Sequence, residues 1–193
     1  DGFKINLIKI PTDEKVPIIF SQPTDTRYSY GTSKFMCEFL IKEFGAKFNI
    51  PSLIIRYHNI YGTRMGNKHA IPQIINRIVS GENPLNVFGA EETRAFCYVD
   101  DAVDATFKLG TRKIKNGEII HIGNDKEEIK IKDLTQKIVE ILNVKVKLKL
   151  LKGKSSSVMR RCPNISKLTK LTSFRPKTNL DNGLKKTIKW YLK

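Results

Sequence analysis

The sequence has little of what marks secreted, membrane-spanning or zinc-binding proteins. Only three cysteines occur in 193 residues, Cys37, Cys97 and Cys162, and no two of them have the C-x-x-C spacing. They predict neither a disulfide framework nor a metal site, and a reducing cytoplasm is the expected location. No stretch approaches the roughly 18 consecutive apolar residues of a membrane span, and no charged-then-apolar signal segment opens the chain. The sequence therefore predicts no membrane partner.

Acidic residues are scarce in the second part of the chain. The sequence contains 35 Lys and Arg against 19 Asp and Glu, and residues 111–193 alone contain 22 against 7. The net charge of +16 raises the question of a nucleic-acid partner. Lysine outnumbers arginine 26 to 9, whereas guanidinium groups usually dominate specific phosphate and base contacts. The basic residues are thus more typical of a solvated surface, and nucleic-acid binding is the weakest of the three hypotheses given below.

Internal repeats and low-complexity tracts are also absent, and helical and strand patterns alternate along the chain. Near-helical spacing of apolar residues predicts a helix over residues 30–48, and the β-branched run 52–57 that follows predicts a buried parallel strand. Further helices are expected at 71–79, 100–109, 131–142, 165–171 and 180–192, and strands at 86–88, 95–99, 118–122 and 144–150, the last at an edge. Residues 1–27 look irregular, and 152–157 form a loop. This alternation predicts an α/β protein.

The first pattern with chemical meaning is Tyr30-Gly31-Thr32-Ser33-Lys34. Residues four apart share one face of a helix, so the phenol of Tyr30 and the ammonium of Lys34 can interact. A phenol with a pKa of about 10 is a poor base at neutral pH, but a neighbouring positive charge favours the phenolate. Tyr30 would then exchange a proton with a hydroxyl or carbonyl group. A Tyr and a Lys at this spacing also occur on helices without any function, and the pair alone does not decide between these alternatives.

Further sequence blocks give this pair a context. Followed by a predicted helix and strand, residues 29–34 resemble the Tyr-x-x-x-Lys site of extended short-chain dehydrogenases/reductases, the NAD-dependent nucleotide-sugar epimerases and dehydratases. Five later blocks resemble this family in the same order: 56–62 (R-x-x-N-x-Y-G), 94–101 (R-x-F-x-Y-V-D-D), 121–124 (N-I-G-N), 161–167 (R-x-P-D-I-S-K) and 174–191 (W-x-P-K to T-I-x-W-Y). Thr63 and Asn164 depart from the usual Pro and Asp, at positions without an expected catalytic role. The resemblance extends over residues 23–191.

The resemblance implies a cofactor and the residues that contact it. Tyr30 would be the general acid/base that faces the sugar. Lys34 would hold the hydroxyl groups of the nicotinamide ribose and lower the pKa of the tyrosine. Together with Tyr57, these are the expected binding residues for NAD or NADP, and no metal is expected.

The resemblance also implies a substrate, a nucleotide-diphosphate sugar. Asn59 matches an asparagine that contacts the nucleotide sugar. Arg94 and Arg161 match arginines that clamp the diphosphate, for which a planar charged fork is well suited. For Arg94 the alternative is a surface ion pair with Asp100 or Asp101, and we favour the ligand role.

The three histidines have a weaker claim to function. His58, His69 and His121 are more typical of packing or surface positions than of catalytic ones. His69 is the exception to examine, because it precedes the predicted helix at 71–79, where members of the family have their substrate lid. We therefore include His69 among the expected substrate-binding residues.

The fold that the resemblance implies is the C-terminal part of a Rossmann-like, doubly wound parallel sheet plus a smaller α/β substrate-binding domain. Residues 1–62 would be the remnant of the NAD-binding domain, and 63–193 mainly the substrate-binding domain, with 95–122 returning to the Rossmann part. A complete family member begins with a G-x-x-G-x-x-G turn whose N–H groups hold the NAD pyrophosphate, and the sequence contains no such turn. We therefore expect the C-terminal portion of such an enzyme, starting just after its serine-bearing strand.

A chain of this kind should expose apolar surface. The strand at 52–57 would lack at least one neighbour, and the helix with Tyr30 and Lys34 would lack the sheet face that it covers. In the family this helix also helps to form a dimer. A homodimer through the helix with Tyr30 and Lys34 is thus expected on two grounds.

Three hypotheses for function follow. In the first, the parent protein is an NAD-dependent nucleotide-sugar epimerase, dehydratase or decarboxylase that works through a keto-sugar intermediate, with block 56–62 closest to the epimerase and UDP-glucuronate-decarboxylase-like branches. In the second, the chain is a catalytically inactive nucleotide-sugar-binding or interaction module. In the third, it is a basic nucleic-acid-binding domain built on the residues after Arg112.

Overall fold

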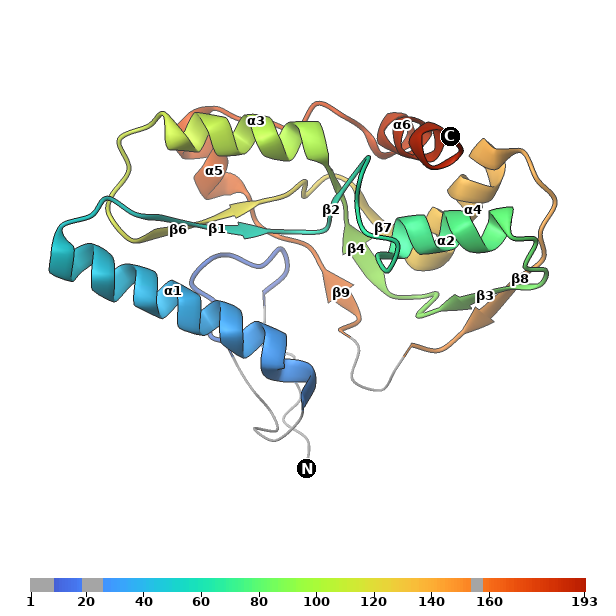
Figure 1. Cartoon of the computed structure of the whole chain (residues 1–193), viewed down its shortest axis with the longest axis horizontal. Coiled ribbons are helices and arrows are strands. Elements are labelled where there is room, and N and C mark those ends of the chain that lie inside the picture. Colours follow the sequence, from blue (N-terminus) through green and yellow to red (C-terminus); the bar gives the residue numbers. More distant parts are fainter. Residues whose placement is uncertain (1–8, 19–25, 154–157) are drawn as a thin grey trace.

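The computed structural model describes residues 9–18, 26–153 and 158–193 (Figure 1). Its elements follow in chain order as η1 (Thr26–Tyr28), α1 (Ser29–Phe48), β1 (Leu53–Tyr57), β2 (Ile60–Tyr61), α2 (Ala70–Val79), β3 (Leu85–Phe88), β4 (Thr93–Ala95), β5 (Cys97–Tyr98), α3 (Val99–Gly110), β6 (Glu118–Ile122), β7 (Glu128–Lys130), α4 (Ile131–Leu142), β8 (Leu148–Leu151), β9 (Arg160–Arg161), α5 (Ser166–Thr172) and α6 (Leu180–Tyr191). In this part of the chain, no helix combines the length and the apolar character that crossing a membrane requires. The prediction of an α/β protein is confirmed.

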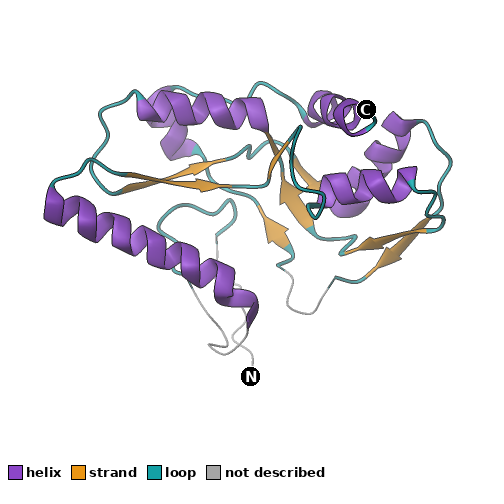
Figure 2. Cartoon of the chain, in the orientation of Figure 1, coloured by secondary structure: helices purple, strands orange, loops and turns teal. Residues whose placement is uncertain are grey.

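Parallel pairing dominates the strands, as the sequence predicts. β1 pairs with β6, β2 with β5 and β3 with β8, each in parallel. β4 lies between β7, which is antiparallel to it, and β9, which is parallel. Figure 2 shows these short strands along the middle of the molecule with helices on both sides. Among the described residues β1 has one strand neighbour, which agrees with the expected open edge.

Two apolar cores lie side by side along the molecule. In one, α3 and α5 cover β6, and Ala105, Leu109, Ile120 and Leu168 are almost fully buried. Figure 1 shows both helices on the same side of β1 and β6. This burial follows the apolar spacing of the predicted helix and strand.

The second core joins α2, α4 and α6 to β2, β3 and β5. Fully buried side chains such as Ile75, Leu134 and Leu184 fill it. A close approach fixes α6 here, because a Cβ at Gly183 would overlap the hydroxyl group of Tyr61. Only glycine lets the helix backbone come this near to the ring.

Helix α1 stands apart from both cores. Only Gly45 of its twenty residues is buried, and Phe39, Phe44 and Phe48 are each more than half exposed. Figure 1 shows α1 on the side of β1 and β6 opposite to α3. The expected exposure of apolar surface on this helix is therefore confirmed.

The shortest strands are the elements that sequence patterns miss. The prediction of a single strand over residues 95–99 was wrong, because Phe96 separates β4 from β5. The edge strand expected at 144–150 begins only at Leu148 and pairs with β3. No pattern indicated β2, β7 or β9, since two or three residues are too few for a period. Residues 9–18 are irregular apart from one bridge at Thr12, and the rest of the expected irregular start and of the 152–157 loop lies largely outside the described residues.

Candidate functional site

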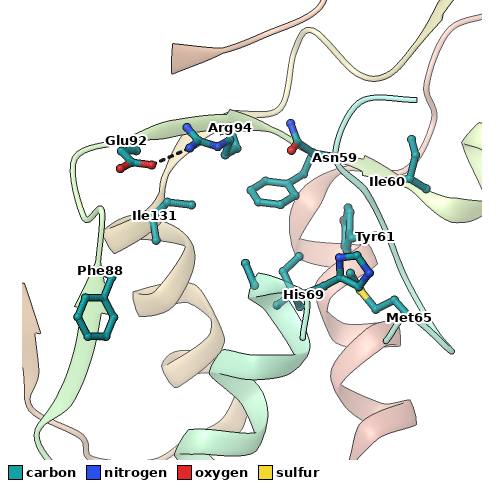
Figure 3. A pocket seen from close by; sticks show the side chains of 12 residues that line it. Asn59, Ile60, Tyr61, Met65, His69, Phe88, Glu92, Arg94 and Ile131 are labelled. Carbon is teal, nitrogen blue, oxygen red and sulfur yellow. Dashed lines mark hydrogen bonds and ion pairs between the residues drawn. The ribbon is translucent and has the colours of Figure 1, made fainter. Parts of the chain in front are cut away.

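A cavity of about 300 Å³ lies between β2, the start of α2, β3 and β4. Its polar lining consists of Asn59, His69, Glu92 and Arg94, and the other lining residues are mainly aromatic or aliphatic. Figure 3 shows these side chains around the space. A mostly apolar cavity with a few fixed polar groups is the usual form of a small-molecule site. Three of the residues predicted for substrate binding therefore share one wall.

Asn59 is fixed in the turn between β1 and β2. Its φ angle of 44° lies in the left-handed region, which asparagine tolerates better than most residues. The side-chain Nδ2 donates to the carbonyl oxygen of Ala95 at 3.1 Å, and the backbone carbonyl accepts from Cys97 N–H at 3.2 Å. These bonds hold the Asn59 side chain just before the start of β2, where the residue lines the cavity.

Arg94 projects from β4, and two acceptors hold its guanidinium group. Nη1 donates to the carbonyl oxygen of Thr93 at 2.7 Å, and Nη2 donates to Oε2 of Glu92 at 2.6 Å. The alternative ion pair with Asp100 or Asp101 is wrong. Asp101 instead accepts backbone N–H bonds from residues 177 and 178, and Asp100 lies 3.9 Å from Nζ of Lys186.

Glu92 is a site residue that the sequence analysis missed. It is 8% exposed and lines the cavity beside Arg94. A usable signal existed, because residues two apart in an extended segment point to the same side, and Glu92 precedes Arg94 by two. Among the lining residues it supplies the acidic group.

Arg161 lies next to Arg94 across the β4–β9 pairing, where the two residues are Cα partners. The side chain of Arg161 is exposed on one side and surrounded by protein atoms on the other. This partial burial lowers its pKa, the positive charge of Arg94 lowers it further, and the carboxylate of Glu92 opposes both effects. The structure thus brings the two predicted arginines together, with Arg94 in the cavity wall and Arg161 beside it.

His69 immediately precedes α2 and lines the same cavity. Its backbone N–H donates to the carbonyl oxygen of Gly66 at 3.0 Å, and its own carbonyl accepts from Gln73 N–H at the start of the helix. Figure 3 places its ring next to Tyr61 and Met65. The imidazole can therefore donate to or accept from a molecule in the cavity.

Tyr30 and Lys34 lie on the first turns of α1, outside the cavity. Nζ of Lys34 is 5.3 Å from the centre of the Tyr30 ring, so the four-residue spacing does bring the two groups together. Tyr30 is 73% exposed. The pair has the proximity that proton exchange by the phenol requires, but neither residue contributes to the cavity wall.

Tyr57 and two histidines occupy the ends of β1 and β6. The Tyr57 hydroxyl is 2.9 Å from Oγ1 of Thr106, and the residue is 53% exposed. The rings of His58 and His121 lie 4.3 Å apart, and Glu14 of segment 9–18 accepts from the His121 backbone N–H. Burial lowers the pKa of each imidazole to about 4, so both are neutral at pH 7.

The sequence of residues 9–123, more than half of the chain, matches the profile described as the NAD dependent epimerase/dehydratase family. The chain belongs to this family. This epimerase/dehydratase family chain is 30% identical over 190 residues to a UDP-N-acetyl-alpha-D-glucosaminuronate decarboxylase of Bacillus cytotoxicus, covering 94% of the chain and 58% of that protein. It is 27% identical over 162 residues to a UDP-glucuronate 4-epimerase of Thermodesulfobacterium geofontis, covering 83% and 49%.

Solved structures give the same picture of this family chain. A UDP-glucuronic acid 4-epimerase from Bacillus cereus, in complex with UDP-glucuronic acid and NAD, matches with a TM-score of 0.78 and 29% identity over 84% of the chain and 52% of that protein. A UDP-glucose 4-epimerase from Thermotoga maritima matches with a TM-score of 0.84 at 23% identity, over 97% and 59%. The Rossmann-like fold is confirmed. The chain spans about half to three fifths of the length of these relatives.

Proposed function

We propose that this chain supplies the nucleotide-sugar-binding part and the proton-transferring pair of an NAD-dependent nucleotide-sugar epimerase or dehydratase. The observation that carries the proposal is the cavity walled by Asn59, His69 and Arg94, with Arg161 beside it. An apolar space flanked by two guanidinium groups suits a nucleoside diphosphate, whose base is flat and whose diphosphate is charged. The names of the relatives support UDP as the nucleotide.

The residues would divide the work as follows. Arg94 and Arg161 bind the diphosphate, Asn59 and His69 contact the nucleotide sugar, and Tyr30 takes a proton from a sugar hydroxyl. The ammonium of Lys34 stabilises the phenolate that accepts this proton. With NAD bound as hydride acceptor, loss of this proton and of a hydride from the sugar carbon that carries the hydroxyl would give a keto-sugar, which would then be reduced, dehydrated or decarboxylated.

NAD fits one end of this chain. Tyr30 and Lys34 on α1 and Tyr57 at the end of β1 are exposed side chains, and we assign them to the ribose and nicotinamide. When bound, NAD supplies the hydride acceptor for the sugar carbon. The sequence has no glycine-rich turn for the pyrophosphate.

We assign residues 1–62 to the NAD-binding domain and 63–193 mainly to the substrate-binding domain, with 95–122 returning to the NAD-binding domain.

The exposed helix α1 also supports a homodimer. Phe39, Phe44 and Phe48 leave apolar surface that solvent does not favour. A second copy that presents the same helix would cover part of it. The free thiols of Cys37, Cys97 and Cys162 support a reducing, cytoplasmic location.

The test is a calorimetric titration of the chain with UDP, GDP and dTDP. Arg94→Ala should weaken binding of the preferred nucleotide at least tenfold, roughly the loss of one charge-assisted hydrogen bond. Arg112→Ala, at an exposed arginine outside the cavity, is the matched control and should leave the affinity unchanged. Binding that survives Arg94→Ala, or that follows charge alone with a steep dependence on salt, would reject the proposal in favour of nucleic-acid-type binding.

A catalytically inactive binding module is the second candidate. The observation in its favour is that neither Tyr30 nor Lys34 lines the cavity, and that Tyr30 is 73% exposed. Under this alternative, Tyr30→Phe leaves nucleotide binding unchanged and no turnover of UDP-sugars with NAD is measurable for either protein. Turnover that Tyr30→Phe abolishes would decide for the enzyme.

A further inference from the structure

Glu92 presents a carboxylate beside the two arginines, and the inference drawn from it rests on the proposed function, in which these arginines bind a diphosphate. The residue is 8% exposed, and its Oε2 accepts from Nη2 of Arg94 at 2.6 Å (Figure 3). A carboxylate is an unexpected neighbour for an anion, because like charges at a partly desolvated site repel each other. Its presence therefore calls for a physical reason.

The first reason is the repulsion between the arginines themselves. Arg94 and Arg161 are partners in a parallel strand pair, where backbones run roughly 4.8 Å apart and paired residues leave the same face. The positive charge of Arg94 makes Arg161 harder to keep charged, whereas Glu92 acts in the opposite direction. Without a bound anion, the three side chains together carry two positive charges and one negative charge.

The second reason is that the backbone is shaped around this carboxylate. At Gly89, which has a φ of 65°, an added Cβ would lie 2.7 Å from Cδ of Glu92. At Gly153 an added Cβ would overlap Oε1 of the same carboxylate. Two segments far apart in the sequence thus leave room for the Glu92 carboxylate beside Arg94.

We propose that Glu92 is an internal counter-ion of the arginine pair, which a bound diphosphate must compete with. It stabilises Arg94 and Arg161 in the protein without nucleotide. In the complex it repels the diphosphate and keeps nucleotide affinity below the value that the arginines alone would give. The consequence is faster release of the nucleotide.

The deciding variant is Glu92→Gln, which removes the charge and keeps the shape. UDP should bind to it about tenfold more tightly, equivalent to about 1.4 kcal/mol, and the more weakly charged UMP should gain less. The affinity should also fall more steeply with salt, since the site has one more net positive charge. Glu91→Gln, the control, removes the same charge from the neighbouring residue. The Glu91 carboxylate is exposed and pairs with Lys130 and Lys132, so this variant should leave UDP affinity unchanged.

Stability without nucleotide gives a second, independent measurement. In low salt, Glu92→Gln should unfold at a lower temperature than the unmodified chain. Added pyrophosphate should remove this difference in unfolding temperature. Gly153→Ala displaces the carboxylate from Arg94 while keeping every charge, so it should raise UDP affinity by a smaller factor, and it carries the test if Glu92→Gln does not fold.

Two outcomes separate this inference from the proposed function. Equal or weaker binding of UDP to Glu92→Gln and Gly153→Ala, with normal binding to the unmodified chain, would overturn the counter-ion role and leave the nucleotide site intact. Absence of UDP binding to the unmodified chain would reject the proposed function instead. In that case the low-salt stability of Glu92→Gln still decides whether Glu92 stabilises the arginine pair.

Discussion

The two ends of the molecule solve the burial of apolar side chains differently. Around α2, α4 and α6, side chains such as Leu134 and Leu184 are fully buried within the chain. In α1, Leu40, Phe44 and Phe48 remain 45 to 55% exposed although the helix is as apolar as its counterparts. The apolar side chains of α1 are therefore left largely uncovered by the described part of the chain, whereas those around α2, α4 and α6 cover one another.

The difference also separates the two halves of the proposed site. Arg94, Asn59 and His69 belong to the packed end, where hydrogen bonds and close contacts fix them. Tyr30 and Lys34 belong to the exposed end, where they contact each other and Tyr30 is 73% exposed. Nucleotide binding should thus be the more robust property, and proton transfer the one that depends on added structure.

Among single substitutions, the largest expected change in the free energy of unfolding comes from one member of a matched pair of leucines. Leu134→Ala should lower the free energy of unfolding by about 3 kcal/mol, because it leaves a cavity in a packed core. Leu40→Ala, on the exposed helix, should cost less than about 0.5 kcal/mol. Urea unfolding of both variants measures the two values.

Protein concentration turns this pair into a test of the homodimer. If Leu40→Ala costs little in dilute solution but more at high concentration, a second copy covers α1. A cost that equals that of Leu134→Ala at every concentration would break the comparison, because α1 would then be packed within a single chain.

A pH effect that adds over two histidines is expected at the exposed end. His58 and His121 each have a pKa of about 4 in the folded protein, mainly through burial, against 6.5 as the ordinary value. As the pH falls below about 6.5 the unfolded chain takes up protons first, so stability present at pH 7 is lost by up to roughly 1.4 kcal/mol per pH unit for each histidine, and the loss levels off near pH 4. Arg56 disfavours the charged form of both rings, and Glu14 favours that of His58.

Urea midpoints between pH 7 and pH 5 measure this slope. His58→Phe should reduce the slope by about half, since it removes one of two titrating groups. A slope that survives His58→Phe in full would show that other groups cause the acid sensitivity.

The sequence predicted long elements well and close contacts poorly. Residues 30–48 and 131–142 were recognisable as helices because apolar spacing persists over several turns, and motif order predicted the family. Glu92 was missed because its position two residues before Arg94 was not used, and because the approach of Gly89 and Gly153 to its carboxylate has no local sequence pattern. For Arg94 we favoured the ligand role, and the alternative ion pair with Asp100 or Asp101 does not form, because Arg94 pairs with Glu92 and Asp101 accepts N–H bonds from residues 177 and 178.

A smaller loss of folding free energy is expected at Asp101, which binds the loop before α6. Its two carboxylate oxygens accept N–H bonds from Lys177 at 3.2 Å and Thr178 at 2.9 Å, and the residue is 5% exposed. Asp101→Asn should cost about 1 to 2 kcal/mol, because an amide offers one acceptor where two are needed. Asp100→Asn, at a well-exposed side chain, should cost less than about 0.5 kcal/mol in the same urea experiment. Equal costs would mean that the loop before α6 does not depend on this carboxylate.

The smallest effect concerns the side-chain tie between α1 and β1. Oε1 and Oε2 of Glu38 accept from Nε and Nη2 of Arg56 at 2.7 and 2.6 Å. Glu38→Gln should cost under about 1 kcal/mol, since the pair is partly exposed, but it should speed hydrogen exchange in the first turns of α1. The far end should keep its exchange rates, because Gly45 packs against Ser52 there.

This last experiment links the tie to the proposed proton transfer. The first turns of α1 contain Tyr30 and Lys34, so more frequent opening of the helix start would disturb both their four-residue spacing and their position relative to β1. Glu43→Gln is the control, because Glu43 is exposed on the same helix and has no ion pair within the described residues. Faster exchange in both variants would assign the effect to helix charge. Faster exchange in Glu38→Gln alone would show that the ion pair with Arg56 helps to hold α1 against β1.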